Sequence, residues 1–296
     1  MTSIIEIWTE VARECEILRL GCPDSNFANF QRLWLPLATN LKNKRKPFVQ
    51  GILAPQGTGK TTLTRILKTI LNHWDIPVIV FSIDDLYKTY SQRQELRQRD
   101  PRLIWRGPPG THDIDLGRQV ITDFKRGEFP LSLPGFDKSL HSGQGDRIAP
   151  VEIQSADILL LEGWFVGMKP VQSNSFDSPP DPIVTPDDQQ FARDCNDRLW
   201  DYLPLWECID ELLILHPLDY RFSLQWRKEA ERKMRLQGKG GMSDSEIEEF
   251  VKYFWKALHP EIFIQPLLQE AHMVVEIKND RTTGKIYAKD RDEPIV

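Results

Sequence analysis

Cysteine is scarce in this chain, and positive charge is not in excess. Only four cysteines occur in 296 residues, and no two of them form a CxxC pair or join a histidine cluster with the spacing of a zinc site. This excludes a disulfide scaffold and favours ordinary thiols of a reducing compartment. Lys and Arg number 38 against 43 Asp and Glu, for a net charge of −5. That balance argues against a protein that coats nucleic acid or an anionic membrane.

The sequence also lacks any apolar run of the roughly 20 residues that a membrane-spanning helix needs. Ile158–Leu161, for example, is interrupted by Glu162. The first residues carry Glu6, Glu10 and Glu14, whereas secretory signals begin with basic residues and organelle transit peptides avoid acids. We therefore expect a cytoplasmic monomer with neither a membrane nor a nucleic-acid partner.

What the chain does contain is an alternation of short β-type and longer helical patterns. Between residues 63 and 71, apolar residues recur at the spacing of one helix face. Five runs are instead apolar at consecutive positions, which is typical of strands buried on both faces of a parallel sheet. These runs are Phe48–Leu53, Val78–Ile83, Ile158–Leu161, Leu212–Leu215 and Met273–Ile277. The alternation predicts an α/β fold, with a mainly parallel five-stranded sheet flanked by helices.

Two segments stand outside this alternation. Residues 1–46 have helical patterns, so we expect an N-terminal helical segment before an α/β domain at 47–296. Residues 170–190 are rich in Pro, Asp and Ser and have no periodicity. We expect them to form a mobile surface insertion that is dispensable for chemistry.

The most informative segment is GILAPQGTGKTTLTRIL, in which residues 54–61 match the phosphate-binding loop, or P-loop, except that Ala54 stands for its first glycine. Glycines at 57 and 59 let successive backbone N–H groups point into one concavity at a helix N-terminus. A lysine here reaches the β- and γ-phosphates, and a following threonine holds Mg²⁺. We expect a P-loop NTPase core whose nucleotide site comprises Gly57, Thr58, Gly59, Lys60, Thr61 and Thr62. Because the guanine-reading sequence Asn-Lys-x-Asp is absent, ATP with Mg²⁺ is the expected cofactor.

Acidic residues follow two of the predicted strands. Asp84 and Asp85 end the run VIVFSIDD, and Glu162 follows ILLL. Ligands bind beyond the carboxyl ends of strands in an open α/β sheet. An aspartate there would accept the proton of an attacking hydroxyl or help to hold the metal, and Glu162 would hold or polarise the magnesium shell. The alternatives are that the aspartates cap the next helix and that Glu162 pairs structurally with Lys60.

Several motifs of the sequence together resemble those of a known family. The strings APQGTGKTTL, SIDDLY, RGPPGTHDIDL, FDKSLHSGQGDR, LLLEGWFVG and WRKEAERKMR, which span about Gly51 to Phe250, look like those of the D-glycerate 3-kinases of plants and cyanobacteria. That family is similar to the uridine kinase, phosphoribulokinase and pantothenate kinase group. The resemblance implies a P-loop kinase core with a small mobile lid, and an activity in photorespiratory glycolate salvage.

The resemblance also implies site roles. Asp84 matches the catalytic aspartate of the wider group, which favours it over Asp85 as general base. Glu162 matches a metal-associated glutamate, so that the implied metal residues are Thr61, Asp84 and Glu162. The implied acceptor site includes Tyr87, Arg106, His112, Asp137, Lys138 and Arg147. The cations would bind a carboxylate, while His112 and Asp137 would bond hydroxyls. Each of these residues also has a structural alternative, such as packing for Tyr87.

The lid is expected at about 221–245. Lys228, Arg232 and Arg235 share one helix face, and Arg227 lies beside it. We expect Arg227 and Arg235, with Lys60, to stabilise charge on the transferring phosphoryl group when the lid closes. Glycines at 238–241 would supply the loop, and Ser243 with Glu246 would form a capping box for the next helix. The alternative is a solvated helix with internal salt bridges.

The residues leave three functions open. The first is transfer of the ATP γ-phosphoryl group to the 3-hydroxyl of D-glycerate. The second is a related kinase of another small alcohol, such as a nucleoside or pantothenate. The third is a non-catalytic ATP-binding module, against which Asp84 and Glu162 argue because such a module needs no acceptor base.

Overall fold

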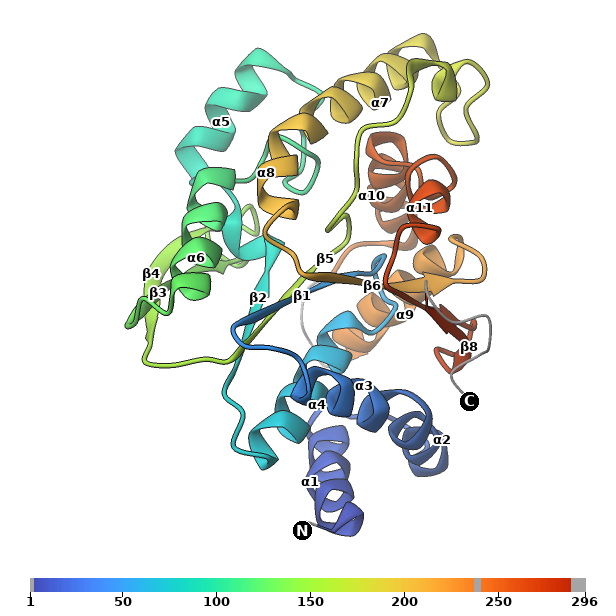
Figure 1. Cartoon of the computed structure of the whole chain (residues 1–296). Helices are drawn as coiled ribbons and strands as arrows, with labels where there is room; N and C mark the ends of the chain where they lie inside the picture. The colour runs from blue at the N-terminus through green and yellow to red at the C-terminus, as the bar shows by residue number, and fades with distance from the viewer. Residues whose placement is uncertain (1–2, 237–240, 289–296) are drawn as a thin grey trace.

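In a computed structural model, described over residues 3–236 and 241–288, the centre of the fold is a six-stranded sheet in the order β2-β5-β1-β6-β7-β8 (Figure 1). The first five strands in this order are parallel, and β8 pairs antiparallel with β7. The strands are β1 Phe48–Leu53, β2 Val78–Ser82, β5 Ile158–Gly163, β6 Glu211–Pro217, β7 Met273–Ile277 and β8 Thr283–Ala288. The predicted mainly parallel sheet is therefore confirmed. The edge strand β8 was not predicted, because TGKIYA contains no consecutive apolar run.

Helices cover both faces of the sheet. Val49 and Leu53 of β1 point into one hydrophobic cluster, whereas Phe48 and Ile52 point into the other. The second cluster is closed by α4 (Lys60–His73), which buries Leu63, Ile66, Leu67, Ile70 and Leu71 as its apolar spacing predicts. The first lies beneath α6 Ile114–Arg126, α7 Pro186–Arg198, η4 Leu199–Tyr202, α8 Leu203–Trp206, α10 Asp244–Ala257 and α11 Pro260–Leu268.

The N-terminal segment is helical, as expected. It consists of α1 Ile4–Ile17, α2 Pro23–Asn29, the π-helix η1 Phe30–Trp34 and α3 Leu35–Lys42. These helices lie near α4 in the lower part of Figure 1, and their buried side chains join the same hydrophobic cluster as α4. The Arg65–Glu14 ion pair adds a polar contact between α4 and α1 at 2.6 Å.

A separate hairpin projects beside β2. Strands β3 (Leu131–Asp137) and β4 (Asp146–Ile153) pair antiparallel, joined by a turn at 138–145. The motif FDKSLHSGQGDR thus consists of the two strand ends and this turn. The strands escaped prediction because their exposed positions and their prolines give no apolar periodicity.

The expectation of a mobile surface insertion at 170–190 was wrong for part of that segment. Phe176, in the short helix η3 (Ser173–Phe176), and Ile183 are 1% and 2% exposed and belong to the core cluster beneath α7. The C-terminal end of the segment already forms the start of α7, with Thr185 and Asp188 in a capping box. Two apolar residues separated by prolines anchor this segment without producing a periodic pattern.

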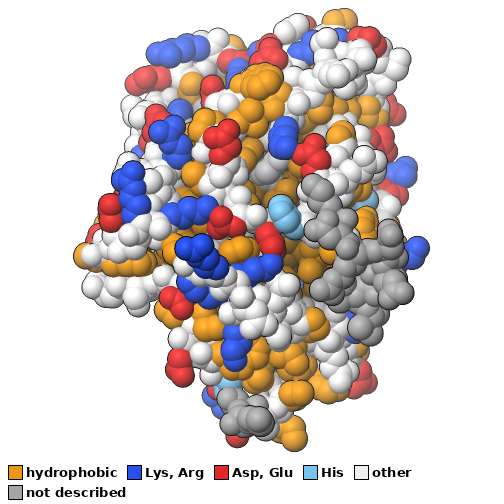
Figure 2. Space-filling view, in the orientation of Figure 1, with side chains coloured by type: hydrophobic (Ala, Val, Ile, Leu, Met, Phe, Trp, Pro, Cys, Tyr) orange, Lys and Arg blue, Asp and Glu red, His pale blue; other side chains and the backbone are white. Residues whose placement is uncertain are grey.

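Three further elements border the site: η2 Ile83–Leu86, α5 Tyr90–Arg99 and α9 Phe222–Leu236. No helix within residues 3–236 and 241–288 is long and apolar enough to cross a membrane. On the face shown in Figure 2, acidic and basic side chains are interspersed.

Candidate active site

The P-loop leads from the end of β1 into α4. Gly57 and Gly59 both have positive φ, +81° and +98°, and Gly59 is the N-terminal cap of α4. Lys60 and Thr61 therefore stand at the first turn of a helix, where free backbone N–H groups favour a bound anion. The hydroxyl of Thr58 donates to the Pro55 carbonyl at 2.6 Å, which fastens the loop. The local geometry is that of a phosphate cradle.

Residues distant in sequence hold this loop from outside. Trp226 of α9 is fully buried, and a Cβ atom at Gly57 would lie only 2.6 Å from its Cβ atom. Arg281, in the turn between β7 and β8, donates to the Gly57 carbonyl at 3.1 Å and pairs with Glu229 of α9 at 3.0 Å. Neither Trp226 nor Arg281 was predicted to contact the P-loop, since no local motif marks them and only the fold brings them to it.

Asp84 lies in η2, directly beyond β2. Its carboxylate accepts hydrogen bonds from Lys138 Nζ at 2.6 Å and from the Tyr87 hydroxyl at 2.8 Å. Burial alone would raise the pKa of Asp84, but the charge and hydrogen bond of Lys138, the Tyr87 hydroxyl and the charge of Lys60 outweigh it and lower this pKa to about 2. The carboxylate is therefore ionised at neutral pH.

Asp85 has a different environment. Its carboxylate accepts the backbone N–H of Ser82 at 3.1 Å in a capping box of η2. The capping alternative thus describes Asp85, while Asp84 keeps its carboxylate for Lys138 and Tyr87. This division favours Asp84 as the residue available for chemistry.

Glu162 lies on β5, where it is paired in register with Ile52 of β1 and Ser82 of β2. It is 6% exposed, and its Oε2 atom has no hydrogen-bond partner among the described residues. Burial raises the pKa of Glu162, although the charge of Lys60 opposes this shift. An orphaned buried carboxylate oxygen beside the P-loop suits a divalent cation.

The described residues contain no group of three or more His, Cys, Asp and Glu side chains that could hold a metal by themselves. A Mg²⁺ ion at Glu162 would therefore need other oxygen ligands, such as the Thr61 hydroxyl and nucleotide phosphates. This is the way in which P-loop enzymes hold magnesium, so the residues present fit the ion.

Tyr87 and His112, two of the residues expected to bind the acceptor, form a stacked aromatic pair. Tyr87 and His112 are 4% and 1% exposed, and their rings stack 4.6 Å apart. His112 Nδ1 is 2.7 Å from the hydroxyl of the buried Tyr202, and burial lowers the pKa of His112 to about 3. Burial and the neighbouring Asp84 raise the pKa of Tyr87 well above its ordinary value, so that its hydroxyl stays a donor.

The other residues expected to bind the acceptor differ in their hydrogen-bond partners. Arg147 donates to the Tyr87 carbonyl and to Asp113, both at 2.9 Å, and therefore fixes the backbone next to the site. Asp137 accepts the backbone N–H and the hydroxyl of Ser139, which fastens the hairpin turn. Lys138 is the one placed directly on Asp84, and its side chain is 60% exposed.

The expected lid helix exists as α9, and α10 begins with the predicted Ser243–Glu246 capping box. The basic residues of α9 pair largely with acids of α10. Arg235 contacts Asp244 at 3.0 Å, Arg232 contacts it at 3.9 Å, and Lys228 contacts Glu248 at 3.6 Å. Arg227 pairs with Glu231 on its own helix. Only the Arg227–Glu231 pair is an internal salt bridge of the kind that the alternative expected, whereas the other three pairs join α9 to α10. Positions 238–240 of the expected glycine loop lie outside the described residues.

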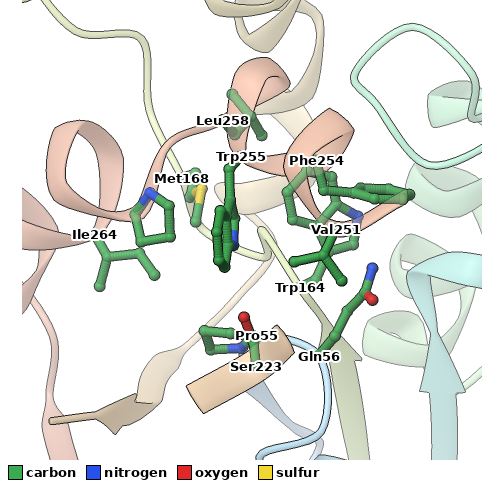
Figure 3. A pocket seen from close by; sticks show the side chains of 11 residues that line it. Pro55, Gln56, Trp164, Met168, Ser223, Val251, Phe254, Trp255, Leu258 and Ile264 are labelled. Carbon is green, nitrogen blue, oxygen red and sulfur yellow. The ribbon is translucent and has the colours of Figure 1, made fainter. Parts of the chain in front are cut away.

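A small aromatic cavity of about 30 Å³ lies between the P-loop and helices α10 and α11 (Figure 3). Trp255 and Phe254 line it from α10, opposite Pro55 and Gln56 of the P-loop. Trp164, two residues after Glu162, completes the wall. The cavity therefore borders the start of the P-loop on the side that faces α10 and α11.

A phosphate cradle after β1, an ionised aspartate beyond β2 and a buried glutamate on β5 together define a P-loop kinase. Similarity to known proteins narrows this class. The chain is 32% identical to the uncharacterised kinase mug58 of Schizosaccharomyces pombe over 222 residues, covering 72% of this chain and 80% of that protein. It is 31% identical to the chloroplastic D-glycerate 3-kinase of Arabidopsis thaliana over 257 residues, covering 82% of this chain but only 54% of that protein.

The solved structures agree with this assignment. A D-glycerate 3-kinase from Cryptococcus neoformans superposes with a TM-score of 0.75 at 27% identity, covering 86% of this chain and 96% of that one. No model of a known protein family matches the chain. The chain belongs to the D-glycerate 3-kinase family of P-loop kinases.

Proposed function

We propose that the protein transfers the γ-phosphoryl group of ATP to the 3-hydroxyl of D-glycerate, giving 3-phosphoglycerate. The observation that carries this proposal is the Asp84 carboxylate, held between Lys138 Nζ and the Tyr87 hydroxyl beside the P-loop. The names of the Arabidopsis and Cryptococcus relatives support the same acceptor.

In this reaction Asp84 accepts the proton of the 3-hydroxyl, while the oxygen of that hydroxyl forms a bond to Pγ. The bond from Pγ to the β–γ bridging oxygen breaks, and ADP leaves. Lys60 and the backbone N–H groups of the P-loop stabilise the phosphate charge, and Thr61 and Glu162 would hold Mg²⁺, which neutralises the developing charge on the phosphate oxygens. Arg227 and Arg235 of α9 would contribute only if they leave their partners on α9 and α10.

A small carboxylate substrate needs cations in a site from which water is excluded. Lys138 bonds Asp84, which also accepts the Tyr87 hydroxyl, and the Arg106 guanidinium lies 5.9 Å from the centroid of the Tyr87 ring. We assign carboxylate recognition to this pair. We assign the other three to supporting contacts: Arg147 to the Tyr87 carbonyl, Asp137 to the hairpin turn and His112 to Tyr202.

The test is ADP release by the purified full chain with MgATP and a panel of acceptors: D-glycerate, L-glycerate, pantothenate and uridine. Pantothenate belongs in the panel because some relatives are named pantothenate kinases, at 28% identity over 46% of this chain. Stimulation by D-glycerate alone, with 3-phosphoglycerate identified by NMR, is the expected result. Stimulation by another alcohol would overturn the acceptor, and ATP binding without ADP release in the presence of any acceptor would favour a non-catalytic ATP-binding module. A cytoplasmic location and a monomeric state stay predictions.

A further inference from the structure

A second cavity, of about 190 Å³, lies beside the acceptor region. Its wall comes from α5, from the segment that contains Leu103 and Trp105, and from the hairpin turn at Ser142–Gln144. Three arginines line it, Arg93, Arg97 and Arg106, and no Asp or Glu does. The cavity is therefore strongly electropositive.

The three arginines form no ion pair with any acid of the described residues, although most arginines of the chain that the structure describes do so. Arg93 is 8% exposed and donates only to backbone carbonyls, those of Lys88, Gln144 and Gly145 at 2.6 to 2.7 Å. Arg106 likewise donates to the Gly143 carbonyl at 2.7 Å. Carbonyl dipoles satisfy hydrogen bonds but leave the net charge of the pocket uncompensated.

The acid whose charge acts on Arg93, Asp146, already has other partners. Asp146 accepts backbone N–H groups of Tyr90 and Arg147 at 2.8 and 2.9 Å, and it pairs with His141 at 3.1 Å. Burial, and next the charge of Arg106, lower the pKa of Arg93, while Asp146 opposes this only in part. Neighbouring guanidinium groups thus repel each other in a partly desolvated place, and a bound anion would relieve this repulsion.

We propose that this pocket binds a small oxyanion, a carboxylate or a phosphate group, through Arg97 and Arg106, with Arg93 supplying charge from behind. Planar guanidinium groups match both anions with paired hydrogen bonds. The anion has two possible sources. One is the carboxylate of the acceptor itself, since Arg106 faces the ring of Tyr87, whose hydroxyl bonds Asp84. The other is a free anion that occupies the pocket independently of the acceptor.

Arg97→Gln is the test variant, and Arg99→Gln is its matched control. Both arginines are exposed on α5, so that neither substitution threatens folding, but only Arg97 lines the pocket. Binding of inorganic phosphate and of D-glycerate to the full chain is measured by calorimetry, with the P-loop filled by Mg²⁺ and the β,γ-imido analogue of ATP. We expect Arg97→Gln to weaken anion binding about 10-fold, the usual effect of losing one charge-assisted hydrogen bond, and Arg99→Gln to leave it unchanged.

Competition identifies the source. If D-glycerate displaces phosphate, the pocket receives the acceptor carboxylate; if both bind together and only the phosphate affinity depends on Arg97, it receives a free anion. The proposal is overturned if neither anion binds the wild-type chain at millimolar concentration, or if the two variants bind alike. Since the assay requires no turnover, its outcome does not depend on whether the proposed kinase reaction is correct.

Discussion

Replacing Gly57 with alanine tests how tightly α9 is joined to the P-loop. Gly57 has φ +81°, and an added Cβ atom would lie 2.6 Å from Cβ of the fully buried Trp226. An L-residue in the left-handed region costs about 1–2 kcal/mol, and overpacking a buried site costs a further ~1–3 kcal/mol. The expected loss of unfolding free energy is thus about 2–5 kcal/mol.

The loss is measured as a shift of Tm, at roughly 2 °C for each kcal/mol in a chain of this size. We therefore expect Tm to fall by about 4–10 °C. The affinity for MgATP should fall as well, because the loop must shift away from Trp226 and its N–H groups then point less well at the phosphates.

Gly127→Ala is the matched control. Gly127 also has positive φ, +71°, but no atom lies within 4 Å of its Cβ position, and it caps α6 away from the P-loop. The Gly127→Ala variant should lose only the about 1–2 kcal/mol of unfolding free energy that the new backbone strain costs, and it should keep its nucleotide affinity. Equal losses of Tm and equal nucleotide affinities in the two variants would refute the coupling of α9 to the P-loop through Trp226.

Two further predictions concern the site and its pH dependence. Lys60→Ala and Asp84→Asn should each lower kcat by at least ~10²-fold; near-normal ADP release by Asp84→Asn would move the assignment to Asp85. Burial lowers the pKa of His112 to about 3 in the folded protein, against about 6.5 when unfolded, so its contribution to stability is complete above pH 6.5 and is lost as the pH falls. Stability should drop by about 2 kcal/mol between pH 6.5 and 5, and thermal unfolding should show a shallower pH dependence in His112→Gln; equal slopes would contradict the buried neutral state of His112.

The parts of the fold that could be predicted are those in which a local pattern fixes the structure. Strands buried on both faces contain runs of consecutive apolar residues, and α4 is apolar on one face, so that both were predictable. Strand β8 and the β3–β4 hairpin have exposed positions, so their sequences contain no run of consecutive apolar residues long enough to predict a strand. Phe176 and Ile183 reach the core from a segment without regular structure along most of its length, and periodicity cannot detect such anchors.

The site divides in the same way. The P-loop is a contiguous motif whose glycines and lysine act through their own backbone, so its position follows from spacing alone. The residues that contact the P-loop from outside cannot be found from spacing. Arg281, for example, donates to the Gly57 carbonyl across 224 positions of sequence. The basic stripe of α9 was visible in sequence, but its acidic partners Asp244 and Glu248 belong to the next helix. Spacing identifies which residues share a face and leaves open what that face meets.

The contact between Asp84 and Lys138 links acceptor recognition to base strength. With Lys138 on its carboxylate, Asp84 has a pKa of about 2, which makes it a poor proton acceptor. The Lys138 side chain is 60% exposed. In the proposed reaction the acceptor carboxylate competes for Lys138, and because burial then acts on Asp84 with less opposition, its pKa rises toward the range of a useful base. An acceptor without a carboxylate would leave Lys138 on Asp84. The ion pair would thus select against neutral alcohols at the chemical step as well as at binding.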